Sequence, residues 1–401
     1  MFYTENKMDR ILDISKRKQQ AALPKFKRYL AADIDWSQRL ILILGHRGAG
    51  KTTLMLQKMQ EVEDNAVYLS LDDFLFEEKR LIELMDLLYQ KGIRIFFLDE
   101  VHRYPHWSAD LKSVYDNYSD AFFIMSGSSI LELGKGKADL SRRAAVYHLA
   151  GMSFREFISF EKNITFPPRK LEELISNQGT LSEEISDQLD ILALFDQYLE
   201  FGYYPFYRDG QTLYKSRLLE TTNLVLEMDI APFADLTHKT ISTMKKLIFI
   251  ISESVPFIPN ISKLAERLEV SRNTILKTFD LLAQAQILNL LRSETHGISF
   301  LQKPEKIYLQ NTNLAFALSF NRANRGNIRE TFFLNQLQIK HAITLPKYGD
   351  FMVDSQFVFE VGGPNKTSQQ IQGIPNSFIA ADGIKTGSGN KIPLWLFGFL
   401  Y

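Results

Sequence analysis

The chain has 401 residues and a mass of 46.3 kDa, more than one hydrophobic core usually organises, so we expect two to four domains. Hydrophobic residues make up 45% and charged residues 23%, a globular composition that excludes a disordered chain. The 47 basic and 47 acidic side chains leave no net charge, which excludes non-specific coating of nucleic acid, and the absence of cysteine excludes disulfides and Cys-based zinc sites.

The beginning of the chain, MFYTENKMDR, is polar and lacks the apolar stretch of a secretory signal. The longest apolar runs, such as Leu40–Leu44 and Leu247–Ile251, are far shorter than the roughly 20 residues that span a bilayer. We therefore expect a cytoplasmic protein that has no membrane partner.

Residues 9–32 are rich in Lys and Arg and favour a solvated amphipathic helix that packs on the next domain. After this helix, strand-length apolar runs alternate with segments of helical apolar spacing. The alternation predicts an α/β domain over residues 1–150, with a parallel sheet and helices on both faces. The runs predicted as strands are Leu40–Leu44, Ala66–Leu71, Ile93–Leu98, Ala121–Met125 and Ala145–Leu149.

A glycine-rich loop with the pattern GxxxxGK[ST] follows the first of these runs and opens a helix-like segment. Its glycines let backbone N–H groups turn toward phosphate oxygens, and the positive end of the helix faces the same anion. We expect Lys51 to reach the β- and γ-phosphates of ATP and the Thr52 hydroxyl to ligate Mg²⁺. The residues predicted to bind the nucleotide are Gly45, His46, Arg47, Gly48, Ala49, Gly50, Lys51, Thr52 and Thr53.

Two acids, Asp99 and Glu100, end the third strand-like run. We expect Asp99 to hold Mg²⁺, directly or through water, and Glu100 to polarise the attacking water as a general base. The fourth run ends in four residues that begin with Ser126 and include Ser128. One of these two hydroxyls either lies beside the γ-phosphate and orients the water, or belongs to a serine-rich turn that caps a helix.

Two arginines, Arg142 and Arg143, precede the fifth strand-like run. An arginine at this place can stabilise transition-state charge, often on a neighbouring subunit, as part of the catalytic set formed by Lys51, Glu100 and Ser126. The alternative for each arginine is a surface position at a helix end.

These motifs resemble the AAA-type ATPases, the P-loop class that carries an extra strand between the two nucleotide-binding strands. The resemblance is closer to a bacterial and archaeal branch whose members join an AAA core to a winged helix and a nuclease-like C-terminal domain. It implies nucleotide-dependent work, assembly or signalling. In the family pattern Arg143 aligns with the arginine before the last core strand, which implies action across the boundary of a nucleotide-dependent homo-oligomer. The matching segments are 45–53, 99–102 with Trp107, 126–129, 140–143 leading to 153–157, and 198–205.

Beyond residue 150 the apolar positions are mostly at helical spacing, which predicts a helical connector or lid over residues 151–256. Residues 257–300 have the pattern of a winged helix, with a helix at Ile261–Leu268 and a second helix capped by Ser271. In helix–turn–helix proteins that read DNA, the second helix enters the major groove. The alternative here is a packing or lid element, which the neighbouring acids favour because they reduce the local positive charge. The residues expected at DNA are Arg272, Asn273, Thr274 and Lys277.

Residues 301–401 resemble an α/β restriction-endonuclease-like domain. A metal-dependent nuclease of that type needs one acid on a helix, one on a strand and Glu-x-Lys on the next strand; Glu330, Asp350 and Glu360 meet the first requirements. The expected lysine position holds Gly362, so we favour an inactive nuclease-like fold used for binding, with Lys366 as the alternative lysine. The apolar residues 393–401 are expected to form a last strand.

The sequence thus predicts an ATPase that binds ATP and Mg²⁺ and drives or switches an interaction with DNA or a protein partner. The alternatives are a nucleotide-gated binding or signalling module with little turnover, and an ATP-controlled nuclease.

Overall fold

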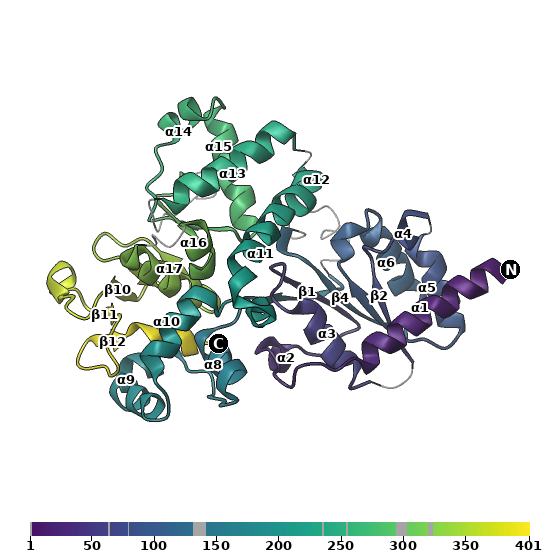
Figure 1. Ribbon diagram of the computed structural model, residues 1–401, viewed down its shortest axis with the longest axis horizontal. Coiled ribbons are helices and arrows are strands. Elements are labelled where there is room, and N and C mark those ends of the chain that lie inside the picture. The colour runs from purple at the N-terminus through teal and green to yellow at the C-terminus, as the bar shows by residue number, and fades with distance from the viewer. Residues whose placement is uncertain are drawn as a thin grey trace. The chain divides into compact units, whose positions relative to one another are not determined.

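The computed structural model describes residues 2–62, 65–78, 80–130, 142–234, 236–253, 256–293, 303–319 and 324–401. The chain divides into two compact units, Met1–Ala150 and Gly151–Tyr401, whose elements are labelled in Figure 1. The division into four domains, at residues 150, 256 and 300, stays a prediction.

The N-terminal unit is built on a five-stranded sheet in the order β2-β3-β4-β1-β5, and every neighbouring pair is parallel. This is the α/β architecture that the alternating pattern predicted. Strand β4 lies between β1 and β3, so an extra strand separates the strand before the glycine loop from the strand that ends in the acid pair. The strands are β1 (Leu40–Gly45), β2 (Ala66–Ser70), β3 (Ile95–Asp99), β4 (Phe122–Ser128) and β5 (Ala145–Leu149).

The side chains of β1 show why this sheet is covered on both faces. All its residues are buried, and alternate side chains enter two separate apolar cores, because successive residues of a strand point to opposite faces. Leu42 and Leu44 pack with one pair of helices, whereas Ile41 and Ile43 pack with another. The first pair is α5 (Leu81–Gln90) and α6 (Trp107–Asn117), and the second is α2 (Leu30–Asp33) and α3 (Lys51–Met59).

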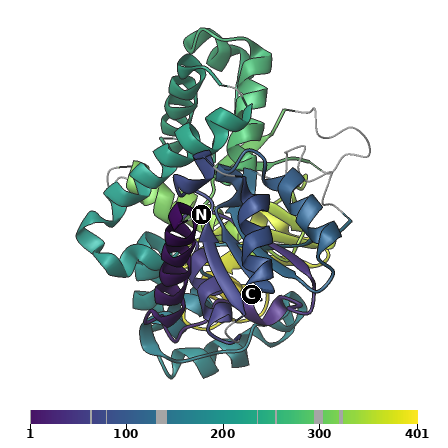
Figure 2. The ribbon, with the colours of Figure 1, turned by 90° about the vertical axis from the view of Figure 1, so that its right-hand side faces the viewer.

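Helix α1 (Phe2–Gln20), dark purple in Figure 1 and Figure 2, runs along β2, the edge strand of the sheet. The buried Ser15 hydroxyl accepts the outward-facing N–H of Tyr68 at 2.9 Å, so the helix satisfies a donor that the edge would otherwise leave unpaired. The expectation of one helix over residues 9–32 is wrong, because α1 ends at Gln20 and α2 begins at Leu30. Pro24 lies between them and disfavours helical backbone there.

The C-terminal unit begins with helices, as expected for residues 151–256. These are α8 (Phe154–Lys162), α9 (Leu171–Ser186), α10 (Ile191–Phe201), α11 (Gln211–Leu224), a π-helical turn (Val225–Ile230), α12 (Ala231–Ala234) and α13 (His238–Ser252). Next come α14 (Ile261–Arg267), α15 (Arg272–Gln284) and an antiparallel pair of strands, β6 (Leu288–Leu291) and β7 (Lys306–Leu309). The second strand of this pair lies beyond residue 300, and the winged-helix assignment stays a prediction.

The segment 198–205, which carried part of the family resemblance, has a structural role. The hydroxyl of Tyr198 donates to Met152 O at 2.7 Å, and the amide of Tyr203 donates to Asn313 Oδ1 at 2.8 Å. Asn313 is fully buried at the start of α16 (Thr312–Leu318), so buried polar groups find partners across sequence separations of 46 and 110 residues.

The last part of the unit is a mixed sheet in the order β12-β11-β10-β9-β8 beside α17 (Arg325–Leu337). Only the β10–β11 and β11–β12 pairs are parallel. The expected strand at residues 393–401 is wrong, because Leu394–Phe399 is a 3-10 helix that is buried throughout, and such a run has no periodicity to separate helix from strand. The strands are β8 (Ile343–Thr344), β9 (Phe351–Val353), β10 (Phe357–Gly362), β11 (Ser377–Ala381) and β12 (Lys391–Pro393).

Candidate functional site

The glycine loop joins β1 to α3, and its three glycines meet two different requirements. Gly48 and Gly50 have φ angles of 84° and 96°, in the left-handed region that residues with a side chain rarely adopt. A Cβ atom on Gly45 would lie 2.3 Å from the carbonyl oxygen of Leu149, so this glycine permits the close approach of β1 and β5. The loop therefore has the backbone freedom that phosphate binding needs at Gly48 and Gly50, whereas Gly45 is required by the sheet.

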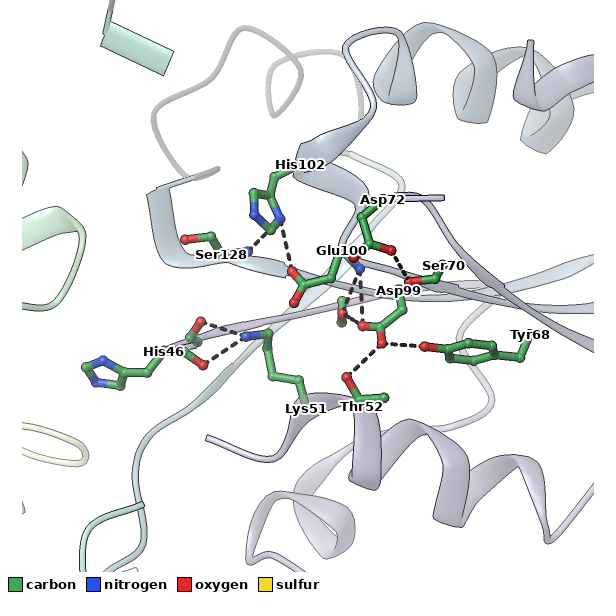
Figure 3. Close-up of polar contacts among 12 residues, drawn as sticks. His46, Lys51, Thr52, Tyr68, Ser70, Asp72, Asp99, Glu100, His102 and Ser128 are labelled. Atoms are coloured by element: carbon green, nitrogen blue, oxygen red, sulfur yellow. Dashed lines mark hydrogen bonds and ion pairs between the residues drawn. The ribbon is translucent and has the colours of Figure 1, made fainter. Parts of the chain in front are cut away.

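Lys51, the first residue of α3, reaches back over the loop (Figure 3). Its Nζ donates to the carbonyl oxygens of Gly45 and His46 at 3.0 and 2.9 Å. The ammonium group is thereby held over the loop whose backbone amides are expected to surround the phosphates. Burial, together with the charges of Lys51 and Arg28, lowers the pKa of His46 to about 3, so its imidazole is neutral at physiological pH.

Arg28 contacts the glycine loop from a distant segment, and no pattern in the sequence indicated this contact. Its buried guanidinium donates to the carbonyl oxygen of Ala49 and, at 2.7 Å, to that of Ala150. Arg28 lies in a stretch interpreted only as a basic helix, and no local motif marks it. The arginine fixes the glycine loop to the end of β5 and adds positive potential where the phosphates are expected.

Asp99 ends β3 and is the centre of the polar network in Figure 3. Its side chain is buried, and its Oδ2 accepts from the hydroxyls of Thr52 and Tyr68, both at 2.7 Å. The other oxygen, Oδ1, accepts from the Ser126 hydroxyl and, at 3.1 Å, from the Glu100 amide. The carboxylate is thus oriented by donors from β2, β4 and α3, which is how a metal ligand is usually held in place.

Tyr68 contacts Asp99 directly, although no motif in the sequence indicates a role for it. In the β2–β3 register Tyr68 lies opposite Phe97, two residues before Asp99, so its long side chain reaches forward to the carboxylate. Burial and the neighbouring Asp99 raise the pKa of the Tyr68 phenol, which keeps it protonated as the donor. A tyrosine in an apolar strand carries no signal of this contact until the register of the strands is known.

Glu100 adopts a left-handed backbone conformation, with φ 52° and ψ 43°. This conformation costs of order 1 kcal/mol or more in a residue with a side chain, and such strain often occurs at functional sites. The Glu100 amide also contacts the Ser126 hydroxyl at 3.2 Å, and its Oε2 lies 3.3 Å from Nδ1 of His102. The amide of Ser128 contacts the same imidazole nitrogen at 3.3 Å. His102 therefore connects the end of β4 with the acid expected to activate water.

The oxygens of Thr52 and Asp99 fit a magnesium ion, because Mg²⁺ prefers oxygen ligands and is commonly bound by one or two protein groups together with phosphates and waters. Within the ranges that the structure describes, no group of three or more His, Asp or Glu side chains is arranged to hold a metal ion. A magnesium site here would thus depend on the nucleotide as well as on the protein.

Arg143, the predicted arginine finger, contacts its own chain. Its Nε and Nη2 atoms lie 3.1 Å from the two carboxylate oxygens of Asp116 on α6. Arg142 is exposed, and residues 140 and 141, which also carried the family resemblance, lie outside the described residues. Action of Arg143 on a neighbouring subunit stays a prediction.

The helix–turn–helix segment exposes three of the four residues expected at DNA. Arg272, Asn273 and Lys277 are exposed on α15, whereas Thr274 is partly buried. The Thr274 amide donates to the Ser271 hydroxyl at 3.0 Å, so Ser271 caps the helix as predicted and Thr274 belongs to that cap. The exposed basic residues in the first half of α15 are Arg272 and Lys277.

The three acids of the C-terminal unit lie on neighbouring elements. Glu330 is on α17, Asp350 precedes β9 and Glu360 is on β10. Lys306 Nζ lies 4.0 Å from Glu330 and 3.7 Å from Asp350. Burial, followed by the charge of Asp350, raises the pKa of Glu330 to about 7.

Lys366 lies where a side chain on residue 362 would lie. A Cβ atom on Gly362 would lie 2.6 to 2.8 Å from the Cβ, Cγ and Cδ atoms of Lys366, so the lysine side chain occupies that space. Its Nζ lies 2.5 Å from Oε1 of Glu360. A lysine from the following loop therefore reaches the acid that the strand motif would pair with a lysine at residue 362.

Comparisons of the sequence with protein families give two matches. Residues 37–158 match a family described as an AAA domain, and residues 192–325 match a domain of unknown function, DUF8612. Over 406 aligned residues the chain is 26% identical to the uncharacterized protein MJ1637 of Methanocaldococcus jannaschii, with 92% of this chain and 84% of that protein covered. The AAA match and the parallel sheet support nucleotide binding and ATP-driven activity.

Comparisons with solved structures give weaker likenesses. The Aeropyrum pernix ORC1 protein in complex with DNA aligns with a TM-score of 0.30 and 12% identity, covering 79% of this chain and 92% of that chain. A structure of Caenorhabditis elegans PCH-2 aligns with a TM-score of 0.23 and 18% identity, covering 38% and 43% of the two chains. At these TM-scores the alignments carry no argument about function. Among the described helices, none is both long and apolar enough to cross a membrane.

Proposed function

We propose that this protein hydrolyses ATP with Mg²⁺ and uses the reaction to drive or switch an interaction with DNA or a protein partner. The observation that carries the proposal is the convergence of Thr52 and Ser126 on the buried carboxylate of Asp99, with Glu100 directly beside it. This arrangement joins the end of the glycine loop to the residue that would activate water.

The roles of the residues follow from their contacts. The amides of residues 45–53 and the Lys51 ammonium would bind the phosphates, and Thr52 and Asp99 would hold Mg²⁺, which would neutralise phosphate charge. Glu100 accepts a proton from the attacking water, with His102 at 3.3 Å from its carboxylate. Ser126 donates to Asp99 and so acts as a positioning residue, which favours Ser128 for contact with the γ-phosphate.

Phosphate release from ATP tests this proposal. The wild-type chain should release phosphate steadily in the presence of Mg²⁺, and Lys51→Ala should lose both ATP binding and turnover. Lys112, exposed on α6, offers a matched surface control as Lys112→Ala. ATP binding with no turnover by the wild type, with or without duplex DNA, would favour the alternative of a nucleotide-gated binding module.

DNA bound through α15 is the first of the two candidate partners in this proposal. Arg272, Asn273 and Lys277 are exposed near the N-terminal end of that helix, the part that touches base edges in helix–turn–helix proteins. The nearby acids Glu266 and Glu269 are also exposed, so the contact would be local rather than a broad basic surface. A protein partner at the same helix is the alternative.

A second candidate activity, metal-dependent cleavage of nucleic acid, is favoured by one observation: Lys366 occupies the place where residue 362 would carry the expected lysine. Binding without cleavage remains our preferred interpretation, because the acids nearby do not form a three-ligand metal site among the described residues. A cleavage assay with Mg²⁺ or Mn²⁺ tests this choice. Cutting by the wild type that is lost in both Asp350→Ala and Lys366→Ala would establish the second activity.

A further inference from the structure

A cavity of about 420 Å³ lies between α1 and the segment that follows β2. Its volume falls within the range of pockets that hold a bound ligand. The apolar side chains at the cavity are Ile11, Ile14, Leu69, Phe74, Leu75 and Phe76, and the cations at it are Arg10 and Lys18. Every lining residue belongs to the N-terminal unit, and none was assigned a role from the sequence.

The apolar lining extends onto the open surface. Phe74 is 80% exposed and Ile14 is 38% exposed, so the cavity opens onto an apolar surface. Contact of this surface with water is unfavourable in free energy. A small molecule inside the cavity would leave Phe74 largely exposed, whereas a segment of a partner protein would cover it. The exposure of this aromatic ring therefore favours a peptide as the occupant.

Arg10 and Lys18 indicate which charges the occupant should carry and how far apart they should lie. Arg10 and Lys18 are eight residues apart on α1, which corresponds to about 12 Å along a helix axis. An extended peptide covers about that distance in three to four residues. Asp73 also lines the cavity, but its Oδ1 accepts from the Leu75 amide at 2.9 Å, so this carboxylate faces its own backbone. The complement is a segment with acids at both ends and apolar residues between them.

The cavity shares one wall with the proposed nucleotide site. Tyr68 lines the cavity, and Lys18 Nζ lies 6.0 Å from the centre of its ring. The hydroxyl of the same tyrosine donates to Asp99 Oδ2, the oxygen that also accepts from Thr52. An occupant that moves the ring or Lys18 would therefore change the hydrogen bonding of the proposed magnesium ligand.

We propose that this cavity binds an extended acidic peptide segment of a protein partner, and that its occupancy is transmitted to Asp99 through Tyr68. The carboxylates at the two ends of the segment pair with Arg10 and Lys18, and the apolar side chains between them enter the cavity. The transmission to Asp99 rests on the proposed ATPase function, whereas the binding of the peptide does not.

The absence of cysteine allows a sharp test of binding. Glu77 is exposed and its amide donates to Phe74 O at 3.1 Å, so Glu77→Cys places a single thiol one turn from the cavity mouth. The probes are the peptides Cys-Gly-Gly-Glu-Leu-Phe-Ser-Glu and Cys-Gly-Gly-Lys-Leu-Phe-Ser-Lys. Each is equilibrated with the protein over a series of reductant concentrations, and the disulfide-linked fraction is measured by mass spectrometry.

The acidic peptide should stay linked at a reductant concentration about threefold to tenfold higher than the basic peptide, the range expected for two exposed ion pairs. Arg10→Ala with Lys18→Ala should remove this preference. Lys16→Ala with Arg17→Ala, which removes the same charge from exposed positions on α1 outside the cavity lining, should keep it. Equal retention of the two peptides by the Glu77→Cys chain would overturn the proposal. A homodimer in which a second copy of the chain fills the cavity, so that neither peptide binds, would overturn it as well.

Transmission is tested on the same linked protein. Linking the acidic peptide should change kcat for ATP by about threefold to tenfold, the effect of one altered hydrogen bond, and Tyr68→Phe should abolish the change. An unchanged kcat in a linked, active chain would contradict the transmission. If the chain has no turnover, the proposed ATPase function fails, and the peptide preference still decides whether the cavity binds its partner segment.

Discussion

The Thr52 hydroxyl donates a hydrogen bond to Oδ2 of Asp99 at 2.7 Å, which joins the first turn of α3 to the end of β3. The two residues are 47 positions apart in the sequence. Because both oxygens suit Mg²⁺, the proposed ATPase would bind its metal ion at this contact.

Thr52→Ala should weaken the binding of Mg²⁺ more than the binding of ATP, because it removes one of the two protein oxygens proposed to contact the metal. We expect the Mg²⁺ concentration for half-maximal turnover to rise by about tenfold or more. Thr52→Ser keeps the hydroxyl and is the matched control. A Thr52→Ala chain whose Mg²⁺ titration coincides with that of Thr52→Ser would count against this metal site.

Arg143→Ala tests the proposed action of an arginine on a neighbouring subunit. If Arg143 stabilises transition-state charge, kcat should fall by about a thousandfold or more, whereas Asp116→Ala should have little effect although it breaks the same ion pair. Mixing Arg143→Ala chains with Glu100→Gln chains should restore part of the activity, because each supplies what the other lacks. Equal losses in Arg143→Ala and Asp116→Ala, with no restoration, would indicate a structural ion pair.

Arg272→Ala with Lys277→Ala should lower the affinity for duplex DNA and reduce the slope of log affinity against log salt by about two, one for each positive charge removed from the DNA surface. The control is Lys16→Ala with Arg17→Ala, which removes equal charge from the N-terminal unit. Fluorescence anisotropy of labelled DNA at several salt concentrations gives both slopes. Absence of DNA binding by the wild type at low salt would remove DNA as the partner.

Glu330 should make the stability of the C-terminal unit depend on pH. Burial and Asp350 raise its pKa to about 7 in the folded chain, above the ordinary value of 4.5. Its stabilising contribution is therefore fully present below about pH 4.5 and is lost as the pH rises through 7. Between these values the free energy of unfolding of the wild type should fall, relative to that of Glu330→Gln, by up to about 3 kcal/mol.

Urea denaturation of both chains at pH 4.5 and pH 8 measures this difference. Glu172→Gln, an exposed change on α9, is the control and should follow the wild type. Parallel pH dependences for the wild type and Glu330→Gln would show that Glu330 ionises normally in the folded chain.

The parts of the site predicted from the sequence are those encoded by local spacing. The glycine loop and the acid pair each occupy a short stretch at a strand end, so their residue types alone indicate where the strand stops and what chemistry follows. Tyr68 and Arg28 could not be found in this way, because their contacts with Asp99 and Ala49 depend on strand register and on the course of a distant segment.

Contacts in the C-terminal unit were equally hard to predict from the sequence. The sequence offered Lys366 as the alternative to the lysine missing at position 362, but it could not decide whether Lys366 reaches Glu360, because this contact depends on the conformation of the intervening loop. The run 394–399 was expected to be part of a strand because it is apolar, whereas it is a 3-10 helix whose residues are all buried, and a run buried on every side has no periodicity that separates the two.

The most direct test of the central claim is a comparison of wild type and Glu100→Gln in two assays, ATP affinity and steady-state phosphate release with Mg²⁺. If Glu100 activates water, the variant should bind ATP as tightly as the wild type and lose turnover by about a hundredfold to ten-thousandfold. An unchanged turnover in Glu100→Gln, with binding retained, would contradict the assignment of this site as the hydrolytic centre.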